Sequence, residues 1–138
     1  MSLSKILVIE SEAVLRIHLR DLLEFQGFEV IEAATGTEGL GLSASEQPNL
    51  VLCGTPLPDM EGLEVLTRLR QNPVTAHIRF IVLSMYSFPP VCRRLLQLDA
   101  NDLLSKPVDE PDLLVAIAQQ LAHQNRHLHI VSGLSESS

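Results

Sequence analysis

Several short apolar runs in this chain end in polar residues of complementary chemistry. These residues are Glu10 and Ser11 after the first run, Ser84 after a later one, and Lys106 after the last. Carboxylate and hydroxyl oxygens are the ligands that Mg²⁺ prefers, and a lysine amine can neutralise a phosphoryl group. Another apolar run, at residues 49–53, ends instead at Gly54. Gly54 offers no side-chain nucleophile at that position.

The order and spacing of these residues resemble the receiver domain of two-component response regulators. Ser84 lies 30 residues after Gly54, and Lys106 lies 22 residues after Ser84 and directly before Pro107. Both intervals are those of the family. Further matches are Pro58, Gly62 and the segment at residues 63–66. The resemblance covers the chain from about residue 4 to about residue 122.

The resemblance implies a vestigial phosphorylation pocket. In the family, the first strand usually ends in two acids, the third in the Asp that accepts a phosphoryl group, the fourth in Ser or Thr, and the fifth in Lys-Pro. The matching positions here are Glu10 and Ser11, Gly54, Ser84, and Lys106. Because Ser11 and Gly54 replace two of the three carboxylates, we expect neither the covalent step nor strong Mg²⁺ binding. The chain is thus expected to have no catalytic residue, no metal ion and no cofactor.

Two pocket residues also have structural interpretations. Ser11 directly precedes the first expected helix, and its side chain is of the type that caps helix N-termini. Lys106 lacks the acceptor carboxylate with which it would ordinarily pair, so we expect it to form an ion pair with Glu10. Loss of one member of a substantially buried pair costs about 3–5 kcal/mol.

Composition and periodicity indicate a single α/β domain. The chain has 138 residues, of which 46% are hydrophobic and only 4% aromatic, enough for one aliphatic core. Apolar runs alternate with amphipathic segments, as in repeated βα units. Strands are expected at residues 5–10, 28–33, 49–54, 78–84 and 102–105. The resemblance implies a flavodoxin-like parallel sheet of order 2-1-3-4-5, with ligands outside the carboxyl ends of strands one and three.

Capping residues and glycines refine this organisation. Thr35 with Glu38 forms a capping-box pattern, and Asp109 precedes the last expected helix. The second helix contains or adjoins three glycines, each of which costs about 0.5–1 kcal/mol in a helix interior, so we expect it to be the weakest. The domain is expected to cover residues 1–123, with a C-terminal tail or linker at residues 124–138.

Charge and hydropathy exclude several function classes. The formal net charge of −7 argues against direct nucleic-acid binding, which requires clustered Lys and Arg. No apolar run reaches the ~18 residues of a membrane-spanning helix, and the N-terminus lacks a secretory signal pattern. We therefore expect a cytoplasmic protein that does not bind membranes.

The resemblance also implies a surface for protein contact. Receivers often carry an aromatic switch residue on the fifth strand, and Leu103 stands at that position here. The interaction surface of the family is formed by the fourth helix, the fifth strand and the fifth helix. In this chain the fourth helix is expected to start near Pro89-Pro90. The mixed charge of this surface comes from Arg93, Arg94, Asp99 and Asp102. Such a surface suits protein recognition or is simply solvated.

Two function classes follow. The first is a signalling module that binds a protein or forms a homodimer without being switched by phosphate, through the fourth helix, fifth strand and fifth helix or through the first and fifth helices. The second retains regulation, with Thr55 or Asp59 as a different phosphoryl acceptor, or with a small ligand in the vestigial pocket. Asp59 lies beyond Pro58 in the following loop and is poorly placed for this role. We favour the first class.

Overall fold

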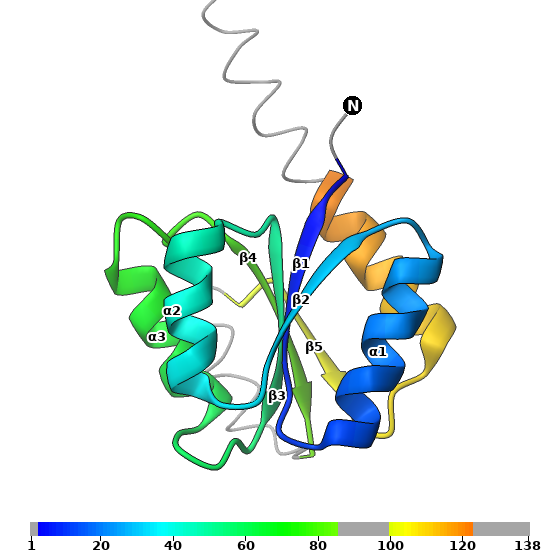
Figure 1. The fold of residues 1–138 in the computed structure, drawn as a ribbon, viewed down its shortest axis with the longest axis horizontal. Helices are drawn as coiled ribbons and strands as arrows, with labels where there is room; N and C mark the ends of the chain where they lie inside the picture. Colours follow the sequence, from blue (N-terminus) through cyan, green and yellow to red (C-terminus); the bar gives the residue numbers. More distant parts are fainter. Residues whose placement is uncertain (1–2, 86–99, 123–138) are drawn as a thin grey trace, which may run out of the picture.

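The computed structural model describes residues 3–85 and 100–122. Its centre is a five-stranded parallel sheet of order β2-β1-β3-β4-β5 (Figure 1). The strands are β1 (Lys5–Ile9), β2 (Glu29–Ala33), β3 (Leu50–Thr55), β4 (Arg79–Ser84) and β5 (Asp102–Ser105). The helices are α1 (Ala13–Phe25), α2 (Gly36–Glu46), α3 (Gly62–Gln71) and a further helix at residues 110–122. The expected flavodoxin-like α/β fold is therefore confirmed.

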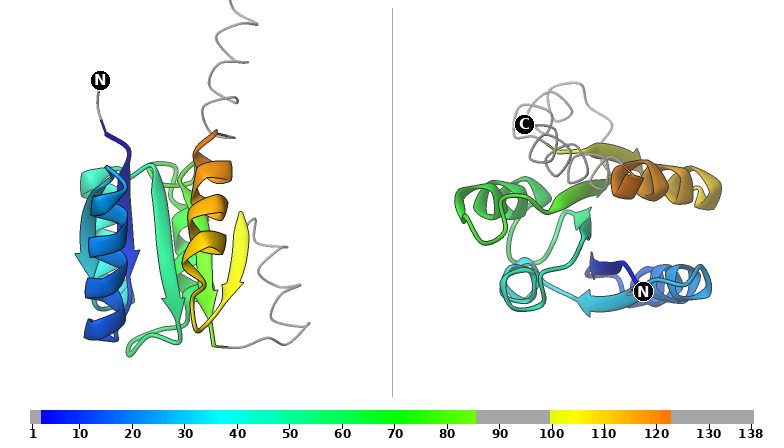
Figure 2. Two further views of the ribbon diagram at one scale, coloured as in Figure 1. Left: turned by 90° about the vertical axis from the view of Figure 1, so that its right-hand side faces the viewer. Right: turned by 90° about the horizontal axis from the view of Figure 1, so that it is seen from above.

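Helices cover both faces of the sheet. Helices α2 and α3 lie on one face, and α1 and the helix at residues 110–122 lie on the other (Figures 1 and 2). Successive strand residues point to opposite faces. Leu7 and Ile9 therefore join the core beneath α2 and α3, whereas Ile6 and Val8 join the core beneath α1. This two-sided burial explains why the central strands are apolar over most of their length.

The expected strands and the expected caps at Thr35 and Asp109 agree closely with the structure. Every strand boundary lies within one residue of its expected position. Thr35 Oγ1 accepts the backbone N–H of Glu38 at 3.1 Å, and Asp109 Oδ1 accepts that of Asp112 at 2.9 Å. Pro89-Pro90 and the expected tail at residues 124–138 lie outside the described residues. Within the described parts, no helix has the length and apolar character that crossing a membrane requires.

Two glycines of α2 stand where the helix packs against other elements. A Cβ on Gly36 would lie 2.5 Å from Met60 Cγ, and one on Gly39 would overlap the side chain of Ile9 in β1. Gly41 differs, because a Cβ there would meet nothing within 4 Å. Close packing thus explains the first two glycines, whereas Gly41 only lowers helix propensity.

We predict opposite effects for alanine at two positions of α2. Gly41→Ala should raise the free energy of unfolding by about 0.5–1 kcal/mol, because it improves helix propensity without a clash. Gly39→Ala should lower it, because Ile9 must move. Urea denaturation of both variants measures the two effects. Equal changes in both variants would contradict this assignment.

Candidate functional site

The polar residues singled out in the sequence meet at the carboxyl ends of the strands. Glu10 follows β1, Gly54 and Thr55 end β3, Ser84 ends β4, and Lys106 follows β5. Parallel pairing places Ile9 beside Cys53 and Thr55 beside Ser84. The site thus occupies the sheet edge where ligands bind in doubly wound folds.

Glu10 and Lys106 form the expected ion pair across this edge. Lys106 Nζ lies 2.8 Å from Glu10 Oε1, and the two side chains are 14% and 2% exposed. Glu10 Oε1 makes no hydrogen bond within the described parts of the chain, so the close approach is an ionic contact outside hydrogen-bond geometry. Glu10 Oε2 accepts the backbone N–H of Glu12 at 3.0 Å.

The ion pair occupies the space beside Gly54. A Cβ on Gly54 would overlap Glu10 Oε1 and would lie 3.2 Å from Lys106 Nζ. Any larger side chain at this position must displace one of the two charged groups. Lys106 itself is positioned by its backbone N–H, which donates to Ser84 O at 2.9 Å. The Lys106–Pro107 peptide bond is cis.

Thr55 is held by a local network. Its hydroxyl donates to Glu61 Oε2 and accepts the backbone N–H of Gly62, both at 2.9 Å. The residue is buried. These hydrogen bonds attach the end of β3 to the start of α3. The Thr55 hydroxyl therefore has a structural role.

Asp59 is held equally firmly, by the first residues of α2. Its carboxylate accepts the backbone N–H groups of Gly36 and Thr37, each at 2.9 Å, and the Thr37 hydroxyl at 2.7 Å. These hydrogen bonds lower the pKa of Asp59 from 3.8 to about 2. Asp59 therefore caps α2 from the loop after β3, at a helix N-terminus that favours negative charge.

The remaining site residues have simpler surroundings. Ser84 is buried at the end of β4. Leu103 is partly buried and packs against the core beneath α2 and α3. Asp102 Oδ1 accepts the backbone N–H of Leu103 at 2.8 Å. The expected partner residues Arg93, Arg94 and Asp99 lie outside the described residues.

One structural expectation was wrong. The N-cap of α1 is Glu12, not Ser11, and no side chain hydrogen-bonds at this cap. The bond from Glu12 N–H to Glu10 Oε2 holds residues 10–12 in a turn, so the helix begins at Ala13. Ser11 is exposed and stands before this turn.

The comparisons with known proteins agree with this architecture. Residues 6–118 match the family described as the response regulator receiver domain. The polar-differentiation response regulator DivK of Brucella ovis is 30% identical over 121 residues, which cover 88% of this chain and 98% of that protein. Sporulation initiation phosphotransferase F of Bacillus subtilis is 28% identical over 117 residues, or 85% of this chain and 93% of the relative.

Solved structures show the same relationship. A CheY-like receiver domain protein from Methanospirillum hungatei has a TM-score of 0.86 and 32% identity, with 91% of this chain and 99% of that chain covered. The fold and site define a signalling module of the two-component class. The chain belongs to the response regulator receiver domain family.

We predict that the Glu10–Lys106 pair contributes strongly to stability. Glu10→Gln keeps the size of the side chain but leaves the Lys106 ammonium without its counter-charge. The free energy of unfolding should fall by about 3–5 kcal/mol at neutral pH, as measured by urea denaturation. The matched control is Glu24→Gln, which removes an exposed carboxylate 3.9 Å from Arg20 and should change stability by less than about 0.5 kcal/mol. Similar stability of the two variants would refute the buried ion pair.

A second prediction concerns pH. Because the pKa of Asp59 is lower in the folded state than its ordinary value of 3.8, its stabilising effect is complete above 3.8 and is lost as the pH falls through about 2. Asp59→Asn should therefore be less stable than the wild type at neutral pH, and the difference should shrink across that acidic range. Thermal unfolding of both proteins at a series of pH values measures this. A difference that stays constant down to the lowest pH would disprove the assignment.

Proposed function

We propose that this chain is a receiver domain that has lost its phosphoryl acceptor and acts in signal transduction through phosphorylation-independent protein contact or dimerisation. One observation carries the proposal. The Glu10–Lys106 ion pair fills the space beside Gly54, where family members place the acceptor side chain. The lysine that would neutralise a phosphoryl group is already paired with a buried carboxylate.

The donor set does not suit Mg²⁺. Mg²⁺ requires hard oxygen ligands in near-octahedral geometry. Glu10 follows β1 and lies at the site, and both of its carboxylate oxygens are engaged, one by Lys106 and the other by the backbone N–H of Glu12. Ser11 and Gly54 supply no further carboxylate. In the described parts of the chain, no group of three or more His, Cys, Asp or Glu side chains is placed to hold a metal ion.

The alternative acceptors are unsuitable for structural reasons. The Thr55 hydroxyl is buried between Glu61 and the N-terminus of α3. The Asp59 carboxylate caps α2, and its low pKa reflects hydrogen bonds that phosphorylation would break. Phosphoryl transfer to Asp59 would break a helix cap, and transfer to Thr55 would break a buried hydrogen bond. Each loss would cost about 0.5–2 kcal/mol of stability. These contacts support a binding module, not an enzyme or a phosphorylated switch.

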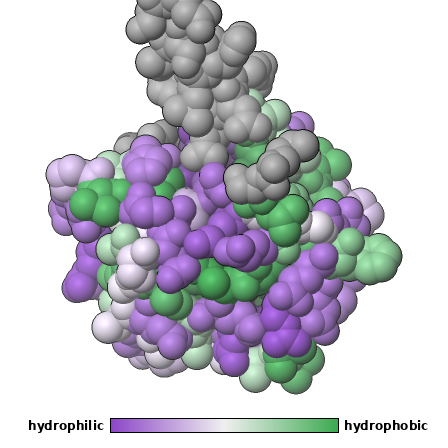
Figure 3. All heavy atoms as spheres, turned by 45° about the horizontal axis from the view of Figure 1, so that its top comes forward, coloured by the Kyte–Doolittle hydropathy of each residue, from purple (hydrophilic) through white to green (hydrophobic). Residues whose placement is uncertain are grey.

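Exposed hydrophobic residues lie on one of the two expected contact surfaces, that of the first and fifth helices. Val14 and Ile17 of α1 are 78% and 42% exposed, and Val115 of the neighbouring helix at residues 110–122 is 55% exposed. The two helices share one face of the sheet (Figure 2). On the face drawn in Figure 3, hydrophilic side chains predominate and hydrophobic ones gather in smaller patches between them. We assign protein contact to the surface of α1 and the helix at residues 110–122.

The relatives are consistent with a signalling role. The curated relatives are named for polar differentiation and for the initiation of sporulation, and this chain covers nearly their whole length. By analogy, the proposed partners are other proteins of a two-component pathway. The net charge of −7 does not favour nucleic acid as a partner.

The direct test is the intact mass after incubation with acetyl phosphate and Mg²⁺. The wild-type chain should show no phosphoryl adduct under conditions in which an ordinary receiver with its acceptor Asp is labelled. Sedimentation equilibrium or partner capture should then give the same result with and without acetyl phosphate. A labelled wild-type chain would overturn the proposal, and peptide mapping would locate the acceptor.

A restored variant provides the positive control within this chain. Ser11→Asp combined with Gly54→Asp returns both missing carboxylates and should regain a phosphoryl adduct. Gly54→Asp alone should lower stability, because the new carboxylate must share Lys106 with Glu10 in a crowded and buried site. Labelling of the double variant with none in the wild type would locate the loss of chemistry at these two positions.

A further inference from the structure

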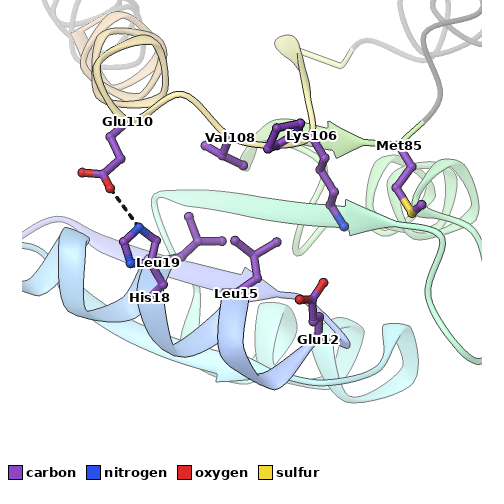
Figure 4. A pocket seen from close by; sticks show the side chains of 9 residues that line it. Glu12, Leu15, His18, Leu19, Met85, Lys106, Val108 and Glu110 are labelled. Atoms are coloured by element: carbon purple, nitrogen blue, oxygen red, sulfur yellow. Dashed lines mark hydrogen bonds and ion pairs between the residues drawn. The ribbon is translucent and has the colours of Figure 1, made fainter.

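A cavity next to the vestigial site has no role in the proposed function. It is open to solvent on one side and has a volume of about 550 Å³ between α1 and residues 106–110. That volume lies within the ~300–1,000 Å³ typical of small-molecule sites. Figure 4 shows side chains from α1 on one wall and from residues 106–110 on the other. The cavity is therefore large enough for a compact organic ligand.

The walls of this cavity are mostly apolar. Leu15 and Leu19 of α1 face Val108 across it, and Pro107 and Met85 also contribute apolar surface to the lining. All of these side chains belong to the described residues. Leu19 is already buried, but a ligand with an apolar body would remove the exposed surface of Leu15, Val108 and Met85 from water, at about 25 cal/mol for each Å² buried.

The charged groups at the cavity are predominantly acidic. Glu12 lines one end, is exposed, and has no ion-pair partner within the described parts of the chain. Glu110 lines the other end and lies 2.9 Å from His18 Nε2. Lys106 also lines the cavity, but its charge is balanced by Glu10 directly behind it. The ion pair therefore leaves Glu12 as the uncompensated charge at its end of the cavity.

We propose that this cavity binds an amphipathic organic cation, with the cationic group beside Glu12 and the apolar body against Leu15, Leu19 and Val108. An organic anion of the same shape would approach two carboxylates, and the lysine is already occupied. A neutral ligand would gain only the apolar contacts. This binding site is additional to the proposed protein contact and does not depend on it.

Three probes with the same apolar body test the charge preference. They are 4-phenylbutylamine, 4-phenylbutanol and 5-phenylpentanoate, each with a phenyl ring and four methylene groups. Binding is followed by NMR titration of the methyl groups of Leu15, Leu19 and Val108, with Leu63 of α3 as the remote reference. The amine should bind about two- to five-fold more tightly than the alcohol, as one exposed ion pair allows, and the carboxylate should bind most weakly.

Matched variants locate the cationic group. Glu12→Gln should weaken the amine about two- to five-fold and leave the alcohol unchanged. Glu24→Gln, on the same helix but outside the cavity, should change neither. Saturable binding of the carboxylate at least as tight as that of the amine would overturn the proposal. So would a lack of saturable shifts at the three methyl-bearing residues, or equal effects of the two variants on the amine. None of these results depends on whether the chain is phosphorylated.

Discussion

The ion pair between Glu10 and Lys106 is the interaction on which the functional edge of the sheet depends. A buried carboxylate requires a counter-charge, because the loss of its hydration is otherwise uncompensated. Here the counter-charge comes from the loop after β5 and the carboxylate from the end of β1, with β3 and β4 between them. The contact therefore joins the carboxyl end of the first strand in the chain to that of the last strand. Gly54 is compatible with this contact because it adds no atoms to the shared space.

The strands could be predicted from local sequence patterns, and the sheet order and this central contact from the resemblance to the receiver family. Apolar runs and turn residues define the strands to within one residue. Parallel connections then bring their carboxyl ends together. With Gly54 at the end of β3, Glu10 is the acid available to Lys106 at that edge. The resemblance to the receiver family implied the strand order and the place of Lys106, and the pairing with Glu10 then followed from charge.

Other contacts depend on how a loop folds back, and the sequence carries little signal for them. The carboxylate of Asp59 reaches residues at the start of α2, more than 20 positions earlier in the chain. Ser11 has a residue type that favours an N-cap, yet Glu12 takes that position because its N–H is bound by Glu10. Local propensity is a weak guide wherever a buried charge competes for the same backbone group. The glycines of α2 illustrate the same limit, since only their neighbours distinguish Gly39 from Gly41.

A receiver domain without a phosphoryl acceptor, as proposed for this chain, carries a different kind of signal from one that is phosphorylated. A modification shifts a conformational equilibrium only to the extent that it interacts differently with the two states. Under the proposed function, Lys106 keeps the same internal partner whatever the activity of an upstream kinase, so no covalent input reaches β4 or β5 through this site. Regulation must then come from non-covalent occupancy, through the concentration of a protein partner or of a ligand. Lys106 lines the apolar cavity and also pairs with Glu10, so a ligand bound in the cavity would lie next to that ion pair.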